Sequence, residues 1–226
     1  YPIDRIGPRQ RLESSLDEMI AHQYDRAKMR DAVECKLFGI GVEAMTVGSH
    51  EFYLGYATRK DTVLCLDMGH FHPTENIADK LSSVALSVEK LLLHVSRPMR
   101  WDSDHVILQS DEIFMMAQEI VASDLLTRTY IGLDFFDATI SRTAAWVIGT
   151  RNMQKALLRA LLLPLSDLKT AEKNLNFTSR FMMTEEAKDL PFGIVWNEFC
   201  SRMGTPTGLD LIKELDSYQT KVSVRG

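Results

Sequence analysis

The sequence has few cysteines, no long apolar run and no excess of positive charge, and each shortage excludes a class of protein. Three cysteines among 226 residues, none in a CxxC pattern, argue against a disulfide scaffold and favour a reducing, cytoplasmic compartment. Cys35 and Cys65 are predicted to pack as small apolar residues. No apolar run approaches the roughly 20 residues that a membrane-spanning helix needs. A net charge of -5 provides no basic surface for nucleic acid or an anionic membrane.

What remains is the composition of a folded globular protein. Hydrophobic residues make up 45% of the chain and charged residues 25%, and 226 residues can bury a substantial core. The chain begins Tyr1-Pro2-Ile3, without the charged and apolar regions of a signal peptide. We therefore expect a piece cut from inside a longer protein.

Four short apolar runs have the character of parallel strands that are covered on both faces. They lie at 32–38, 62–66, 91–95 and 129–133. Helical spacing of apolar residues follows them at 51–58, 75–86, 111–126 and 138–163, where Pro164 stops the last helix. This alternation predicts an α/β fold built on a parallel sheet.

The two ends of this pattern suggest part of a barrel. A helix with Leu12, Leu16, Met19 and Ile20 on one face precedes the first strand, although a repeating β/α protein normally begins with a strand. Beyond Pro164 only helical segments are expected, at 184–188 and 192–200. We predict the second half of a (β/α)8 TIM barrel over 1–164, followed by a helical extension over 165–226 that makes oligomer contacts.

Acidic residues and histidines stand at or just beyond the C-terminal ends of the predicted strands. In parallel β/α folds, this edge of the sheet is where active sites are built. Glu34 lies in the first strand, and Lys36 is two residues further on and therefore on the same face. The later strands contribute Asp67, His70, His94, Asp102, Asp104 and Asp134.

Five carboxylates at one edge would repel one another strongly unless cations separated them. Mixed carboxylate and imidazole ligation suits Mn²⁺, Co²⁺, Mg²⁺ or Zn²⁺, and the absence of a thiolate from this set argues against a structural zinc. Asp102-x-Asp104 and Asp67-x-x-His70 each place two candidate ligands close together. Two ions about 3.5–4 Å apart could hold a hydroxyl and a carbonyl oxygen of one substrate. The pattern therefore predicts a two-metal centre.

Each of these residues also has a structural interpretation. Glu34 and Lys36 could form a salt bridge along the strand. Asp102 and Asp104 could be loop or helix-capping residues. His94 could be a histidine of the core that is satisfied by a hydrogen bond.

Neighbouring residues compete for the same roles. His72 and His105 are near enough to serve as ligands, although they rank below the histidines named above. Asp137 could replace Asp134, but it precedes a helix and is predicted to be an N-cap.

Several long, ungapped stretches closely resemble the C-terminal half of bacterial L-rhamnose isomerase. They are AVECKLFGIG, CLDMGHFHPTE, LLLHVSRPMRWDSDHV, GLDFFDATISRTAAWVIGTRN and KALLRALLLP. The resemblance runs from about Pro8 through the tail. It implies a (β/α)8 barrel of the xylose-isomerase type, a homotetramer, and an enzyme that interconverts L-rhamnose and L-rhamnulose with Mn²⁺ or a similar ion.

The resemblance also assigns the candidate residues to two implied metal sites. The implied structural site consists of Glu34, Asp67, His94 and Asp134. The implied catalytic site consists of His70, Asp102 and Asp104, with Asp67 bridging the two ions. Lys36 matches a lysine expected near the carbonyl end of the sugar.

The implied reaction is an aldose–ketose isomerisation by a metal-assisted hydride shift between C1 and C2, with an enediol route as the alternative. Two other hypotheses compete with it. A metal-dependent barrel phosphodiesterase or endonuclease would need a basic surface, which an acidic chain does not provide. An inactive fragment is the second, because half a barrel leaves sheet edges unpaired and would not close alone.

Overall fold

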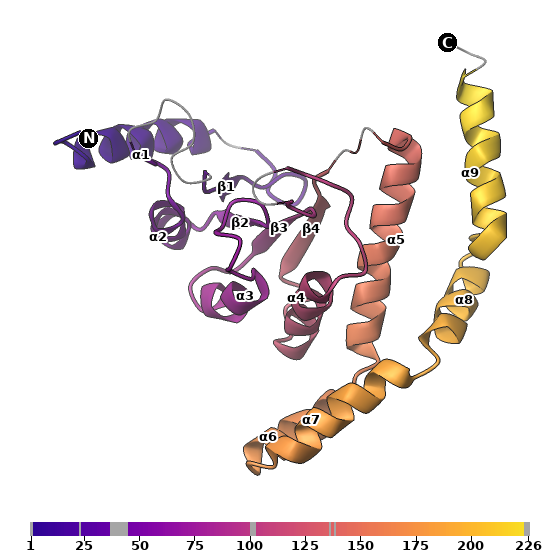
Figure 1. The fold of residues 1–226 in the computed structure, drawn as a ribbon. Helices are drawn as coiled ribbons and strands as arrows, with labels where there is room; N and C mark the ends of the chain where they lie inside the picture. The colour runs from indigo at the N-terminus through magenta and orange to yellow at the C-terminus, as the bar shows by residue number, and fades with distance from the viewer. Residues whose placement is uncertain are drawn as a thin grey trace.

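The structure of the chain is a computed structural model that describes residues 2–22, 24–36, 45–99, 103–135, 137 and 139–223. Its centre is a parallel sheet of β1 (Ala32–Glu34), β2 (Val63–Asp67), β3 (Leu91–Val95) and β4 (Thr129–Leu133), hydrogen-bonded in that order (Figure 1). The helices α2 (His50–Lys60), α3 (Ala78–Ala85) and α4 (Asp111–Ala122) connect successive strands. The α/β class and the parallel sheet are confirmed, and the eight-stranded barrel stays a prediction.

The strands match the sequence-based expectation more closely than the helices do. β3 and β4 have the predicted bounds, and β2 is shifted by one residue. β1 ends at Glu34, while residues 37 and 38 of the predicted strand lie outside the described residues.

Local capping explains why several helices start or stop elsewhere than predicted. α3 begins at Ala78 after the N-cap Ile77, and the Ala78 backbone N–H donates to the Asn76 side-chain oxygen at 2.9 Å. α4 stops at Ala122, two residues before Asp124 adopts a left-handed φ of 56°. α5 (Arg142–Leu161) starts after Ser141, whose hydroxyl oxygen accepts from the Ala144 N–H at 3.1 Å. A predicted start at 138 is therefore wrong.

The core lies between the sheet and the helices that follow its strands (Figure 1). In β3, Leu91, Leu93 and Val95 are fully buried, whereas the alternating Leu92 and His94 are only half-buried. The strand therefore turns one face to the helices and the other face, with His94, to the opposite side. The helical side of the core is completed by Leu81, Val84, Ile113, Met116, Ile120, Ala145 and Met153.

A close approach between a strand end and a helix fixes α5 against the sheet. A Cβ added to Gly149 of α5 would lie 2.1 Å from Cζ of Phe135, which follows β4. Phe135 is buried, so only a glycine leaves room for its ring at this crossing.

The helix α1 (Ile6–Ile20) precedes the sheet and packs beside α2. The Asp17 carboxylate accepts hydrogen bonds from Tyr56 Oη and Lys60 Nζ of α2, each at 2.9 Å. Leu16 is buried, but Met19, which was predicted on the same apolar face, is 66% exposed.

Beyond α5 the chain forms the tail, defined here as residues 165–223. Its elements are α6 (Leu165–Lys173), α7 (Phe177–Glu186), the 3-10 helix η1 (Ala187–Asp189), α8 (Phe192–Arg202) and α9 (Gly208–Ser223). The helical character is as expected, but the predicted segment 184–188 lies across the end of α7 and η1. Trp196 of α8 contacts α5, with the cations of Arg151 and Lys155 at 5.1 and 5.2 Å from its ring centre.

None of the helices in the described ranges combines the length and the apolar character that crossing a bilayer requires.

Candidate metal centre

The parallel register brings the predicted ligands together at one edge of the sheet. Glu34 pairs with Cys65, and Asp67 pairs with His94. Asp134 directly follows β4, and its backbone N–H donates to the Val95 carbonyl at 3.2 Å, which continues the ladder past the strand end. Side chains far apart in the sequence are therefore neighbours because parallel strands end at the same edge.

One imidazole nitrogen lies at the centre of this group. His94 Nδ1 is 3.1 Å from Glu34 Oε1, 3.5 Å from Asp67 Oδ2 and 3.6 Å from Asp134 Oδ2. Ligand atoms of Asp67, His94 and Asp134 all lie within 4.8 Å of one another. The four residues come from four successive strands and meet at a single point.

This arrangement suits a divalent cation better than it suits hydrogen bonding alone. An imidazole nitrogen carries at most one proton, so it can donate to only one of three surrounding carboxylates. The Asp67 side chain is only 3% exposed, and a buried carboxylate beside two others is costly without a counter-charge. Oxygen donors with one nitrogen are the ligands that Mn²⁺ and similar ions accept. The residues present fit a divalent cation.

Asp67 and His70 are both oriented by the backbone. Asp67 Oδ1 accepts the Gly69 N–H at 2.6 Å, which leaves Oδ2 directed towards His94. His70 Nδ1 lies 2.8 Å from the Cys35 carbonyl oxygen. Because a carbonyl only accepts, this hydrogen bond places the imidazole proton on Nδ1. The same nitrogen lies 3.5 Å from Glu34 Oε1, so the ring is held beside the carboxylates. His70 also groups with Glu34 and Asp67 in a second set of possible ligands.

Cys65 forms a third set of possible ligands together with Glu34 and His94. The prediction that this residue packs as a small apolar side chain agrees with its burial, since it is 1% exposed. It did not include the ligand atoms of Glu34 and His94 beside it. Burial first, and then the charges of Glu34 and Asp67, raise the pKa of the Cys65 thiol. The signal was present in the sequence, because residues 65 and 67 of one strand face the same side.

The remaining predicted site residues are not brought into these groups. Asp102 lies outside the described residues. Asp104 has a left-handed φ of 45° and belongs to none of the three sets found among the described residues. Lys36 is exposed at the same edge, and its backbone N–H donates to the Gly48 carbonyl at 3.0 Å. The roles of these three residues stay predictions.

The competing residues have other contacts. His72 Nδ1 lies 2.7 Å from Thr74 Oγ1, on an exposed turn. Asp137 Oδ1 accepts the Thr139 N–H at 2.9 Å, and its Oδ2 is 3.8 Å from His105 Nδ1. The prediction that Asp137 caps a helix is wrong, because it lies five residues before Arg142, the first residue of α5, and Ser141 is the N-cap.

A short bridge holds the loop that carries Asp104, and sequence reasoning did not identify it. Arg97 and His105 form an antiparallel β-bridge, in which the Arg97 N–H donates to the His105 carbonyl at 2.9 Å. Arg97 Nε also donates to the Val106 carbonyl at 3.0 Å. These bonds close the base of the loop between residues 97 and 105.

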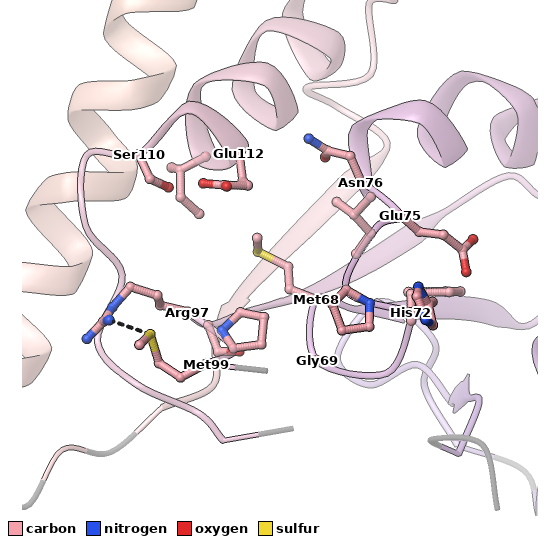
Figure 2. A pocket seen from close by; sticks show the side chains of 15 residues that line it. Met68, Gly69, His72, Glu75, Asn76, Arg97, Met99, Ser110 and Glu112 are labelled. Atoms are coloured by element: carbon pink, nitrogen blue, oxygen red, sulfur yellow. Dashed lines mark hydrogen bonds between the residues drawn. The ribbon is translucent and has the colours of Figure 1, made fainter. Parts of the chain in front are cut away.

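A cavity of about 300 Å³ lies beside the centre, between the loops that follow β2 and β3 (Figure 2). Met68 and Gly69 line it from one loop, and Arg97 and Met99 line it from the other. Figure 2 shows the Arg97 guanidinium turned towards Met99, with Glu112 at the start of α4 across the cavity. The described residues that line it do not include Glu34, Asp67, His94 or Asp134.

Fold and site together define a β/α protein with a candidate divalent-cation centre at its strand ends. The family described as L-rhamnose isomerase (RhaA) matches residues 1–226, and the chain belongs to that family. It is similar to L-rhamnose isomerase of Listeria monocytogenes serotype 4a (strain HCC23), with 58% identity over 224 residues, 99% of this chain and 53% of the relative. L-rhamnose isomerase of Salmonella paratyphi B (strain ATCC BAA-1250 / SPB7) is 56% identical over 220 residues, 97% of this chain and 52% of the relative.

The chain thus spans about half the length of the curated relatives that it matches. Family membership gives no support to the phosphodiesterase or endonuclease hypothesis. The inactive-fragment hypothesis stays open, because a match over half of a relative does not show that half to be active by itself.

Proposed function

We propose that this chain carries the divalent-cation centre of an L-rhamnose isomerase and contributes it to the interconversion of L-rhamnose and L-rhamnulose. Membership of the family supports the reaction. The convergence of Glu34, Asp67 and Asp134 on His94 Nδ1 is the observation that carries the proposal, because three carboxylates around one nitrogen need the counter-charge that a divalent cation supplies.

The proposed structural site uses these four residues, and the proposed catalytic site uses His70, Asp102 and Asp104, with Asp67 shared between them. When bound, Mn²⁺ or a similar ion supplies Lewis-acid stabilisation of the charge that develops on the sugar oxygens. The hydrogen bonds that fix Asp67 and His70 support these assignments, because they orient the carboxylate of one residue and the imidazole of the other before any ion binds.

The remaining roles belong to side chains at the same edge of the sheet. Lys36 is proposed to place a positive charge beside the sugar oxygen that gains electron density. Asp102 is proposed to assist the transfer of a proton between O1 and O2. The bridge at Arg97 supports the position of Asp104, because it holds the base of the loop.

We further propose that a hydride moves between C2 and C1 of the open-chain sugar. An enediol route would instead remove a proton to solvent. L-Rhamnose carrying deuterium at C2 separates the two: a hydride shift keeps the deuterium on C1 of L-rhamnulose, and substantial loss to water would overturn it.

The active protein is proposed to contain a complete (β/α)8 barrel, to assemble as a homotetramer and to act in the cytoplasm. The partial match to longer relatives supports the barrel, since the described strands leave both sheet edges unpaired. Large exposed apolar side chains on the tail support an assembly, and they include Phe181, Ile194, Leu209 and Ile212.

The test is complementation of this chain with the N-terminal half that the longer relatives contain. The chain is expressed alone and together with the N-terminal half of the Listeria relative, and L-rhamnulose formation is measured with added Mn²⁺. Activity is expected only with both halves. If the two halves associate and bind Mn²⁺ but produce no ketose, the proposed function is wrong.

A matched pair of variants tests the site within the active complex. His70→Ala is expected to abolish turnover, because it removes a ligand at the centre. His72→Ala is the control, because that imidazole lies on an exposed turn and contacts Thr74. Equal activity in the two variants would remove His70 from the mechanism.

A further inference from the structure

Cys65 has a position that its burial alone does not explain. It lies on β2 two residues before Asp67 and faces the same side of the sheet. The strand register places it beside Glu34 of β1. Its Sγ lies within 4.8 Å of ligand atoms of both Glu34 and His94, and Glu34 Oε1 and His94 Nδ1 are themselves 3.1 Å apart. Three neighbouring strands thus contribute a thiol, a carboxylate and an imidazole to one point.

These separations suit a tetrahedral cation. Zinc bonds of about 2.3 Å to sulfur and 2.0–2.1 Å to nitrogen put the ligand atoms of such a site roughly 3.3–3.6 Å apart. The distance between Glu34 and His94 is already near this range. The sulfur lies within 4.8 Å of both ligand atoms, so it is at most on the order of 1 Å outside this range.

We propose that Cys65, Glu34 and His94 form a thiolate-containing site for a thiophilic divalent cation of the Zn²⁺ or Cd²⁺ type. Sulfur ligands favour such ions over Mn²⁺ and Mg²⁺, which prefer oxygen. Binding forms a metal–sulfur bond and releases the thiol proton to solvent, with no change in oxidation state. This site overlaps the oxygen-rich one at Glu34 and His94 and differs from it because it uses Cys65 instead of Asp67 and Asp134.

The two sites cannot be filled together, because both need Glu34 and His94. A thiophilic cation therefore expels Mn²⁺ from the oxygen-rich site, and excess Mn²⁺ opposes it. The site makes the centre sensitive to the ratio of soft to hard cations. This inference concerns cation binding only, so it holds whether or not the chain isomerises a sugar.

The test is a titration of the purified, metal-stripped chain with Cd²⁺, followed by the ultraviolet charge-transfer absorption of a cadmium–thiolate bond. Cys35→Ser and Cys200→Ser are matched controls, because both thiols are buried like that of Cys65. The band is expected in the wild type and both controls. In Cys65→Ser it is lost, and Cd²⁺ affinity falls by about tenfold or more. A band of wild-type size in Cys65→Ser, or none in the wild type, overturns the proposal.

Two measurements on the unaltered protein keep the test decisive if the variant folds poorly. X-ray absorption of the Zn²⁺-loaded chain is expected to show a sulfur neighbour at about 2.3 Å, and a shell of oxygen and nitrogen alone overturns the proposal. In the second, Cd²⁺ is added to the Mn²⁺-loaded chain, and released Mn²⁺ is followed by electron paramagnetic resonance. Release is expected in step with the charge-transfer band. Cd²⁺ binding that leaves Mn²⁺ in place shows that the ligands are not shared.

Discussion

The helices on the sheet and the helices of the tail bury their apolar side chains to very different extents. Leu81 of α3 and Met116 of α4 are completely buried against the sheet. No residue of α7 is buried, and its Phe181 and Met182 are 66% and 58% exposed. The sheet offers each of its helices an apolar surface, whereas the tail helices have mainly one another and α5. The difference indicates that the helices on the sheet find their packing partners within the chain, while the tail has apolar surface that a further contact can cover.

Replacement of one leucine in each region tests this comparison, and it has the largest expected effect. Leu66→Ala in β2 is expected to lower the free energy of unfolding by about 2–5 kcal/mol, because the side chain is fully buried and leaves a cavity. Leu209→Ala in α9 is expected to change it by less than about 0.5 kcal/mol, because that side chain is 72% exposed. Denaturant unfolding at low protein concentration measures both.

The stability cost of the same two variants can also be compared at different protein concentrations. If the tail is covered by an assembly, the cost of Leu209→Ala grows with protein concentration, whereas the cost of Leu66→Ala is already large in the dilute chain. Equal costs for the two variants at low concentration would mean that the exposed surface of α9 is covered within a single chain.

The next expected effect is a change in Mn²⁺ affinity at the edge of the sheet, where Asp134 and Asp137 follow β4. Asp134→Asn is expected to weaken Mn²⁺ binding by about 10–100-fold, because a charged oxygen near His94 Nδ1 is lost. Asp137→Asn keeps the turn to Thr139 and is expected to bind Mn²⁺ as the wild type does. Calorimetric titration of metal-stripped protein measures the two affinities. Equal weakening in both variants would indicate a general loss of negative charge instead of a specific ligand.

The sequence was sufficient for the features that depend on strand ends. Once four parallel strands are assigned, Glu34, Asp67, His94 and Asp134 must lie near one another, because such strands end at a common edge. The resemblance to the family then assigns their roles. Asp102 and Asp104 lie in a loop, where the strand pattern gives no position, and only Asp104 is among the described residues.

Features that depend on single side-chain contacts could not be predicted. α5 starts after Ser141, whose hydroxyl caps it, and the first N–H of α3 is bound by the Asn76 side chain, although several nearby residues had equal capping propensity. Cys65 was assigned by its residue type, and the pairing with Glu34 that gives it ligand neighbours requires the register of β1 and β2. Helix ends and the exact register between strands therefore needed the structure, whereas the class of fold did not.

The smallest expected effect is a pH-dependent change in stability. It is compared for two exposed carboxylates, Asp17 of α1 and Glu198 of the tail. Hydrogen bonds from Lys60 first, and then from Tyr56, hold the pKa of Asp17 below its usual value of 3.8. A carboxyl group whose pKa is lower in the folded than in the unfolded state stabilises the fold above pH 3.8, and this contribution is lost as the pH falls through the folded-state pKa. In the tail, Glu198 forms an ion pair with Arg202, at 2.7 Å one turn away on the same helix.

Asp17→Asn is therefore expected to lower the midpoint of urea unfolding at neutral pH, and the difference from wild type should shrink as the pH falls below 3.8. Glu198→Gln should change the midpoint less, because its pair is highly exposed and links no second element. The measurement is urea unfolding of both variants at several pH values. A difference between wild type and Asp17→Asn that persists unchanged in acid would show that the asparagine disturbs the contact of α1 with α2 by its shape, and that the charge of Asp17 does not stabilise it.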